Sequence, residues 1–222
     1  MSRVTFMDGH NFKINKMDDF MAGDKRINQQ EKSRLMQKRL INATLDCLQQ
    51  YGFHGASLSR ILDQAGVSRG AWRHHFESKN DLVAAAAETL FSTALDRAHE
   101  VARELSLASV GISEILEFIW DKFYQGPYRD VWVEFNVACR TDQELSMRLS
   151  PVIRSFFQSL DQIWNTRLGH LSRPTIKAET IMNLSLYLLR GMSFQSISMD
   201  MPDHYREMRN QWVVMLTLLM DT

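Results

Sequence analysis

The sequence predicts an all-α fold of about nine helices, and three observations support this class. Apolar residues recur with helical periodicity from residue 31 onward, and no segment alternates convincingly as a strand does. The chain contains only 10 glycines and 4 prolines in 222 residues, too few for a sandwich or barrel with many tight turns. Hydrophobic residues make up 45% of the chain, which is enough to bury a substantial core and excludes global disorder.

The first helix is predicted over residues 31–51, after a polar stretch, residues 1–30, that we expect to be a disordered extension. One stripe of this helix is apolar, and Gly52 follows as a helix-ending residue. The stripe consists of Leu40, Thr44, Cys47, Leu48 and Tyr51.

Two short helices follow, over residues 58–64 and 69–76, each preceded by a serine N-cap, Ser57 and Ser68. Gly66 ends the first helix at a position that needs positive φ, which glycine adopts without a Cβ penalty. Together they predict a helix-turn-helix. Its small core is predicted to contain Ile61, Ala65, Val67 and Trp72.

Six more helices are predicted in the rest of the chain. The first of them covers residues 79–106 and is capped by Ser78, and its buried face is lined by Leu82, Ala86, Leu90 and Ala94. A capping box at Thr141–Glu144 predicts the start of a helix that reaches Leu168, kinked or restarted at Pro151. Pro174 and Pro202 suit first turns of the last two helices. The remaining predicted ranges are 112–124, 129–140, 174–197 and 203–220, and the pair Gly126-Pro127 is predicted to break the chain between the first two of them.

Charge is unevenly distributed although the whole chain is neutral, with 26 basic and 26 acidic residues. Residues 24–80 contain ten bases and five acids, a net charge of +5, whereas residues 81–222 contain 13 bases and 18 acids, a net charge of −5. A basic N-terminal block on an acidic body suggests that the block binds a polyanion. The exposed residues of the second short helix include Arg69, Arg73, His74 and His75, which suit a DNA major groove.

The stretch AGVSRGAWRHHFESKNDL resembles the TetR/AcrR family of one-component transcriptional regulators, and the resemblance covers about residues 31–82. It implies a helix-turn-helix DNA-binding domain over residues 31–80 and an effector-binding and dimerisation domain over residues 81–222. The family usually has tyrosine where this chain has Arg73, so Arg73 either clamps phosphate or reads a guanine edge. Carried over by position, the DNA-binding residues are Ser57, Ser59, Ser68, Arg69, Gly70, Ala71, Arg73, His74, His75 and Lys79.

The resemblance also implies a dimer formed by the last two helices and an apolar effector pocket among the middle helices. The helices over residues 174–197 and 203–220 carry more apolar side chains than one packed face needs, including Leu184, Leu188, Trp212, Met215, Leu216 and Leu219. We expect a small hydrophobic effector. A cationic effector is a less favoured reading, based on Glu117, Asp121 and Glu134. The candidate effector-binding residues are Phe118, Phe123, Trp132, Phe135, Asn136, Cys139, Phe156, Trp164, Tyr187 and Arg190.

The charge pattern and the family resemblance together predict a ligand-responsive transcriptional regulator, a repressor that a small hydrophobic effector releases from a palindromic DNA operator. A transcriptional activator of the same family and a helical protein-interaction module are the alternatives. No catalytic motif supports an enzyme, and no cofactor is expected. No metal site is expected either, because the adjacent His74 and His75 point about 100° apart on a helix. Two cysteines and the absence of a bilayer-spanning apolar run predict a cytoplasmic protein without membrane contact.

Overall fold

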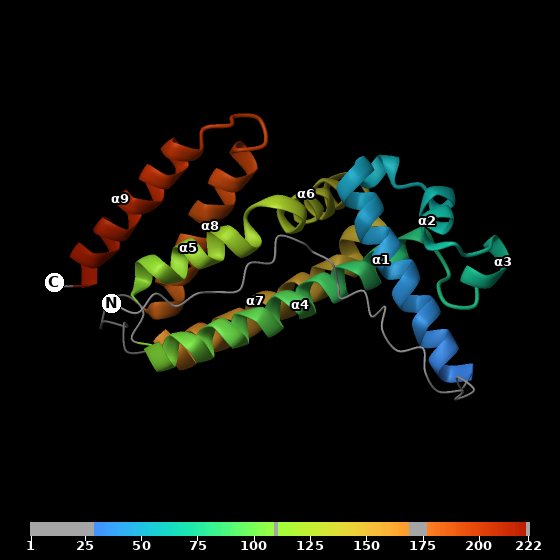
Figure 1. The fold of residues 1–222 in the computed structure, drawn as a ribbon, viewed down its shortest axis with the longest axis horizontal. Coiled ribbons are helices and arrows are strands. Elements are labelled where there is room, and N and C mark those ends of the chain that lie inside the picture. Colours follow the sequence, from blue (N-terminus) through green and yellow to red (C-terminus); the bar gives the residue numbers. More distant parts are fainter. Residues whose placement is uncertain (1–28, 109–110, 169–176, 221–222) are drawn as a thin grey trace, which may run out of the picture.

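A computed structural model describes residues 29–108, 111–168 and 177–220 of the protein. Nine helices and no strand occur in these ranges, as the sequence predicted (Figure 1). The helices are α1 (Gln29–Gly55), α2 (Leu58–Ala65), α3 (Arg69–Trp72), α4 (Lys79–Ala108), α5 (Ile112–Phe123), α6 (Gly126–Thr141), α7 (Gln143–Leu168), α8 (Ala178–Gln195) and α9 (Pro202–Met220).

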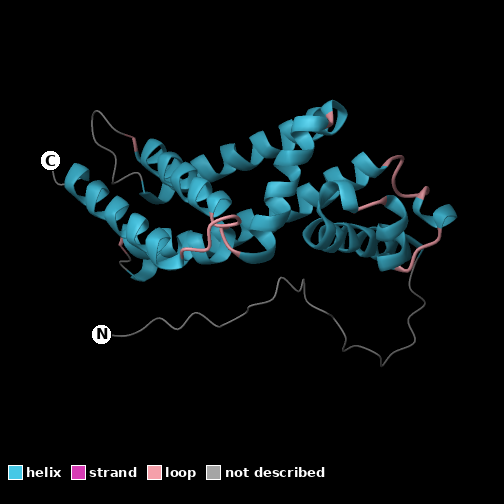
Figure 2. Ribbon diagram, turned by 90° about the horizontal axis from the view of Figure 1, so that it is seen from above, coloured by secondary structure: helices cyan, strands magenta, loops and turns pink. Residues whose placement is uncertain are grey.

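The helices α1, α2 and α3 gather at one end of an elongated molecule, and α8 and α9 lie toward the other end (Figure 1). The two long helices α4 and α7 run side by side along the molecule and connect these ends. The described loops are short, as the view from above shows (Figure 2). The two ends of the molecule are thus joined by two continuous helices.

The apolar core consists of two clusters of buried side chains. The first joins α1, α2 and α3 to the first half of α4, to α6 and to the first half of α7. It contains Leu40, Leu48, Ile61, Trp72, Leu82, Phe91, Trp132, Phe135 and Leu149, among others. Because this cluster continues past residue 80, α1–α3 are packed directly against the body.

The second cluster holds α5, α8 and α9 together with the far ends of α4 and α7. Ile119, Trp120, Leu186 and Leu189 are buried in it. Phe156 and Phe157 of α7 pack against both clusters, so this helix bridges the two halves of the core.

Local chemistry confirms the predicted helix-turn-helix and its caps. Ser57 Oγ accepts a hydrogen bond from the Arg60 amide, and Ser68 Oγ accepts one from the Ala71 amide. Gly66 has φ 60° and ψ 43°, the left-handed conformation expected between the two helices. All four predicted core residues, Ile61, Ala65, Val67 and Trp72, are buried.

The predicted stripe of the first helix is correct for Leu40, Thr44, Cys47 and Leu48 but wrong for Tyr51. Tyr51 is 48% exposed, with the Arg60 guanidinium stacked over its ring at 4.3 Å. The chain kinks at the next residue, Gly52, which has φ 66°, and continues as a short turn to Gly55. The predicted end at Gly52 thus corresponds to a kink.

Two other predicted helices have different limits in the structure. The helix predicted over 69–76 ends at Trp72, because the amides of His74 and His75 bond to carbonyls three residues back and tighten the chain into a turn. The helix predicted over 129–140 begins earlier, at Gly126, where Pro127 occupies the first turn and lacks only an amide that a helix start leaves unused.

The predicted capping box before α7 is replaced by a single cap. Asp142 accepts a hydrogen bond from the Leu145 amide at 2.9 Å, whereas the Thr141 hydroxyl bonds to the Ala138 carbonyl of the preceding helix. The helix then runs unbroken through Pro151, so the predicted restart there is wrong. The eighth helix begins at Ala178, and Pro174 lies outside the described residues.

Of the predicted disordered extension, residues 1–28 lie outside the described part, and Gln29 and Gln30 belong to α1. Within the described ranges, no helix combines the length and hydropathy needed to cross a membrane.

Candidate nucleic-acid interface and internal cavity

The exposed surface of α2 and α3 is cationic and lies at the tip of the molecule (Figure 1). Ser68, Arg69, Gly70, Arg73 and His74 are all exposed. The predicted binding residues Ala71 and His75 are partly buried, and His75 Nδ1 lies 3.5 Å from the Ser33 hydroxyl of α1. Of these predicted residues, His75 is therefore the one turned toward α1.

A hydrogen bond between the two short helices places Ser59 beside Arg69. Arg69 Nη2 donates to Ser59 Oγ at 2.6 Å, which orients the guanidinium along the exposed surface. Gly70 is next to it, and a Cβ built there would meet nothing within 4 Å. The surface at Gly70 is thus open, and a flat partner can approach the backbone closely.

The turn is held in place from α1. Arg39 Nη2 donates to the Ala65 carbonyl at 2.6 Å and to the Gly66 carbonyl at 3.2 Å. These bonds satisfy carbonyls that the end of α2 leaves free. The angle between α2 and α3 is consequently tied to α1.

Lys79 opens α4, as predicted, but its ammonium group already has protein contacts. Nζ donates to the Phe53 carbonyl at 2.9 Å and lies 4.3 Å from the centre of the Phe53 ring. Burial lowers the pKa of Lys79, and the nearby charge of Asp142 offsets part of this effect. An ammonium has three donors, so a phosphate contact remains open to Lys79.

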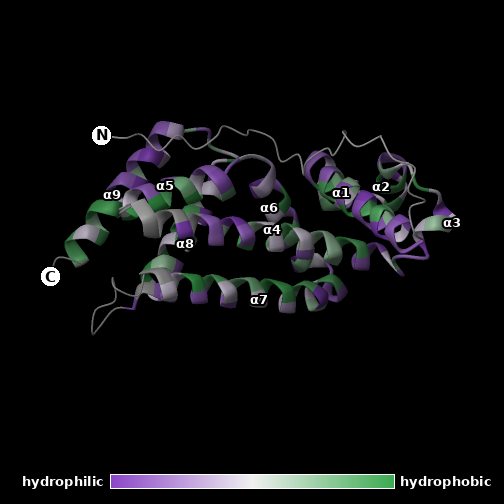
Figure 3. Ribbon diagram, turned by 60° about the horizontal axis from the view of Figure 1, so that its bottom comes forward, coloured by the Kyte–Doolittle hydropathy of each residue, from purple (hydrophilic) through white to green (hydrophobic). Residues whose placement is uncertain are grey.

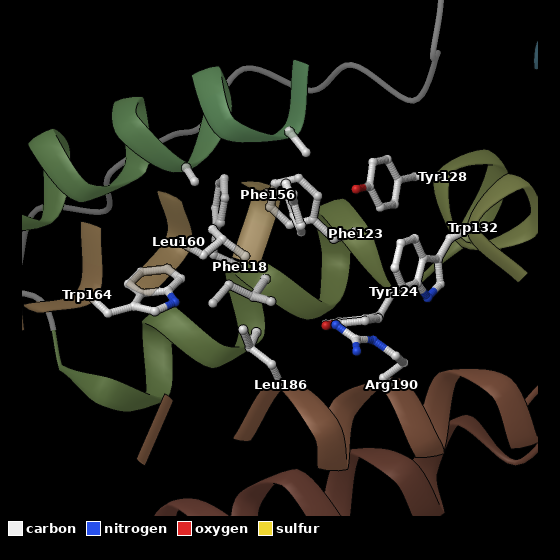
Figure 4. Close-up of a pocket in the computed structure, with 13 residues that line it drawn as sticks. Phe118, Phe123, Tyr124, Tyr128, Trp132, Phe156, Leu160, Trp164, Leu186 and Arg190 are labelled. Atoms are coloured by element: carbon white, nitrogen blue, oxygen red, sulfur yellow. The ribbon is translucent and has the colours of Figure 1, made fainter. Parts of the chain in front are cut away.

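An internal cavity lies in the body, between α4, α5, α6, α7 and α8 (Figure 4). Its empty volume, including the part open to solvent, is about 600 Å³. Aromatic and aliphatic side chains form nearly all of the wall. It is lined by Ala94, Ala98, Phe118, Ile119, Phe123, Tyr124, Tyr128, Trp132, Phe156, Leu160, Trp164, Leu186 and Arg190.

Six of the ten predicted effector residues line this cavity: Phe118, Phe123, Trp132, Phe156, Trp164 and Arg190. The structure places the other four elsewhere. Phe135 is fully buried in the first core cluster, and Cys139 packs against that cluster. Asn136 and Tyr187 line a separate surface groove on the other side of Trp132 and Arg190.

Sequence reasoning missed Tyr124 and Tyr128, whose rings line the cavity. Both flank the Gly126-Pro127 pair, which was interpreted as a break between helices. For Tyr128 a signal was present in the sequence: Trp132 follows four residues later, and this spacing places Tyr128 and Trp132 on the same face of α6. The structure places the acidic residues weighed for a cationic effector outside the lining. Glu117 pairs with Arg209, Glu134 accepts a bond from the Phe53 amide, and Asp121 is exposed.

The comparison with known proteins agrees with this geometry. Residues 40–86, which contain the helix-turn-helix, match the family model for bacterial regulatory proteins of the tetR family. The chain is 25% identical to the HTH-type transcriptional regulator CymR of Pseudomonas putida over 186 residues, 84% of this chain and 91% of that protein. The chain belongs to the TetR family of DNA-binding transcriptional regulators. It is a family of regulators and not of enzymes.

Solved structures of transcriptional regulators share the fold over most of this chain. A TetR transcription regulator from Haloarcula marismortui has a TM-score of 0.64 at 18% identity and covers 81% of this chain and 97% of its own. The regulator FadR from Bacillus subtilis, solved in complex with stearoyl-CoA, has a TM-score of 0.59 at 17% identity and covers 81% of this chain and 96% of its own. At these identities the likeness extends to the fold.

The TetR-family body carries an exposed apolar face at the end opposite the helix-turn-helix. Leu184 and Leu188 of α8 and Met215 and Leu219 of α9 are exposed, whereas Leu216 is buried and Trp212 is partly buried. The C-terminal turns of α9 are coloured as hydrophobic in Figure 3. Solvent-exposed apolar side chains gathered on two adjacent helices are typical of a protein interface.

Proposed function

We propose that this TetR-family chain is a homodimeric repressor that leaves its operator when a small, largely apolar effector enters the cavity. Each subunit would place α3 in the major groove of one half-site of a palindrome. The domain over residues 31–80 would bind DNA, and the body formed by residues 81–222 would bind the effector and form the dimer. The proposed groove contacts are those carried over by position, of which Arg69, Gly70, Arg73 and His74 are the most exposed.

One observation carries the proposal: Trp132 belongs to the cavity wall and to the first core cluster at the same time. Its ring lies 5.3 Å from that of Phe91 of α4 in an edge-on contact. Two residues further along α6, Glu134 accepts a hydrogen bond from the Phe53 amide of α1 at 2.7 Å. An effector that displaces Trp132 would thereby shift α6 against α1, the helix whose Arg39 holds the turn between α2 and α3.

A bound effector changes operator affinity only to the extent that it binds more tightly to one arrangement of the two DNA-binding domains (residues 31–80 of each subunit, here called the heads) than to another. The cavity would supply such a preference, because an effector that fills it pushes on side chains from five helices and so favours the arrangement of the body that leaves it the most room. The complex of FadR with stearoyl-CoA indicates that a related fold accommodates a long apolar ligand.

Dimerisation through α8 and α9 would supply the second head. A single head with net charge +5 over residues 24–80 binds DNA weakly, whereas two linked heads add effective concentration on a two-half-site operator. The exposed Leu184, Leu188, Met215 and Leu219 support this arrangement.

The proposal is tested by selecting duplexes from a random-sequence library with the purified protein at fixed salt. Selected sites should be near-palindromic and bound at least about 10³-fold more tightly than unrelated DNA. In-vitro transcription from a promoter that overlaps the selected site should then fall when the protein is added. Rising transcription would identify an activator, and selection of no common sequence would contradict operator binding. Native mass spectrometry of the purified protein tests for a co-purified effector.

A further inference from the structure

The cavity contains a single charged side chain among its thirteen lining residues, the guanidinium of Arg190 (Figure 4). Arginine stays protonated in proteins, so this charge is permanent. No carboxylate belongs to the lining, and Arg190 forms no ion pair with a described residue. A fixed positive charge on an otherwise apolar wall favours a ligand that supplies the opposite charge.

Three aromatic rings surround the guanidinium, and the Tyr124 hydroxyl is its one hydrogen-bond partner among the described residues. The guanidinium lies 5.1 Å from the Trp132 ring centre, 5.0 Å from that of Phe157 and 5.7 Å from that of Tyr187. These contacts stabilise the cation but accept no conventional N–H hydrogen bond. Arg190 Nε is buried and has no hydrogen-bond partner in the described structure.

The second buried side-chain nitrogen without a partner belongs to the same cavity. It is Nε1 of Trp164, at the far end of the labelled group from Arg190 (Figure 4). An unsatisfied buried donor costs free energy until an acceptor arrives. In the described part of the chain, the cavity thus contains both buried side-chain nitrogens that lack an acceptor.

Two phenols near the guanidinium add donors and no charge. Burial raises the pKa of Tyr124 and of Tyr128, and the nearby Arg190 offsets only part of this rise at each. Both hydroxyls are therefore protonated at neutral pH and available to donate. Figure 4 shows the Tyr124 hydroxyl beside the Arg190 guanidinium.

The outer groove extends the positive surface. Trp132 and Arg190 line both the cavity and this groove, whose walls also include Arg129 and Arg140. Arg129 is paired with Asp130 at 2.7 Å, so Arg140 and Arg190 supply most of the uncompensated charge there. An anion approaching from this side meets favourable charge before it reaches Arg190.

We infer that the effector is an organic anion, with its acidic group against Arg190 and its apolar body along the aromatic wall toward a hydrogen-bond acceptor near Trp164. This rests on the proposed effector function of the cavity and replaces a generic hydrophobic molecule with an amphipathic acid. The recognised chemistry is the negative head group, whether carboxylate or sulfonate.

The test compares two fluorescent probes that share one ring system. 8-Anilinonaphthalene-1-sulfonate carries a permanent negative charge, and N-phenyl-1-naphthylamine lacks it. The wild-type protein should bind the sulfonate at least about tenfold more tightly, because a charge-assisted hydrogen bond contributes that much. Arg190→Met should abolish the preference and leave the affinity for the neutral probe unchanged, whereas Arg190→Lys should keep part of the preference.

A variant that fills the cavity distinguishes probe binding inside the cavity from probe binding on the exposed apolar face of α8 and α9. Ala98 lines the cavity and is 5% exposed, so Ala98→Phe should weaken both probes. If Ala98→Phe weakens neither probe, or neither binds the wild type, the cavity is not the effector site and the proposed function fails with it. If Ala98→Phe weakens both but the wild type binds them equally, or Arg190→Met keeps the sulfonate preference, only the charge inference is overturned. The wild-type comparison decides even if Arg190→Met does not fold.

Discussion

Arg73 follows the last residue of α3, with its side chain in solvent and no hydrogen bond or ion pair to a described residue. It is therefore available to DNA at no cost to the fold. Arg73→Ala should weaken operator binding by about 1–3 kcal/mol and leave the free energy of unfolding unchanged. Fluorescence anisotropy with a labelled operator at fixed salt measures the first quantity, and urea unfolding measures the second.

Arg206→Ala is the matched control for Arg73. Arg206 is likewise an exposed arginine, but it lies on α9, where it pairs with Asp203 at the surface. Its loss should change operator affinity by less than about 0.5 kcal/mol. Equal effects of the two substitutions would show that Arg73 contributes only to overall charge.

Gly52 is needed for the contact between α1 and α6. At φ 66° a side chain is strained, and a Cβ would lie 3.0 Å from Oε2 of Glu134, the atom that accepts the Phe53 amide hydrogen bond. Gly52→Ala should reduce the free energy of unfolding by about 1–3 kcal/mol. Gly70→Ala is the control for urea unfolding, because its Cβ meets open space and should cause no loss. Equal stability of the two variants would contradict the proposed strain.

At the residue scale, the sequence predicted the caps and the turn of the helix-turn-helix correctly, but it misplaced some of the side chains. Ser57, Gly66 and Ser68 were correct because their roles depend on neighbours within four residues. Tyr51 and Phe135 were misplaced because their surroundings come from distant segments. Phe135 lies on the part of α6 that the first core cluster covers, whereas Trp132, less than one turn away, also reaches the cavity.

Among the elements, α9 is attached to α5 by shared core packing and by a half-buried ion pair. Arg209 donates to both carboxylate oxygens of Glu117, at 2.7 and 2.9 Å, and stacks over Trp120 at 4.3 Å. The Arg209 side chain is 6% exposed and that of Glu117 is 39% exposed. Glu117→Gln would leave a buried guanidinium without its counter-charge, so the free energy of unfolding should fall by about 2–3 kcal/mol.

Thermal and urea unfolding check the Glu117 prediction, with Asp203→Asn as the control. Asp203 pairs with Arg206 on the same helix, but both side chains are exposed, and such pairs contribute less than about 1 kcal/mol. If the two substitutions destabilise equally, the Glu117–Arg209 pair is no more than a surface contact.

The periodicity of apolar residues predicted which segments form helices, but packing against other helices decides where some of these helices begin and end. Gly126-Pro127 was interpreted as a break because both residues disfavour helix interiors, yet at the first turn they begin α6. Pro151 stays inside α7 although it lacks an amide, since α7 packs against α4 along its length. Neither outcome can be deduced from the local sequence.

For the whole molecule, the decisive question is whether α8 and α9 join two copies. Leu184 is 53% exposed on α8, and a charge there would disrupt an apolar interface. Leu184→Glu should convert the proposed dimer to a monomer and weaken operator binding at least about 100-fold, because only one DNA-binding domain then contacts the duplex. Sedimentation velocity measures the mass, and anisotropy measures the affinity.

Met147→Glu is the control for the dimer prediction. Met147 is even more exposed, at 65%, but lies near the start of α7, away from α8 and α9. This variant should remain dimeric with unchanged operator affinity. A wild-type protein that sediments as a monomer, or a dimer that survives Leu184→Glu, would contradict the proposed interface.

The construction of the cavity wall has a consequence for timing. Because side chains from five packed helices form this wall, an effector that fills the cavity should leave only as fast as these side chains move aside, so its dwell time should follow the motion of the body. A cell carrying such a regulator would keep its response for a while after the external signal has faded, which gives the circuit a short memory.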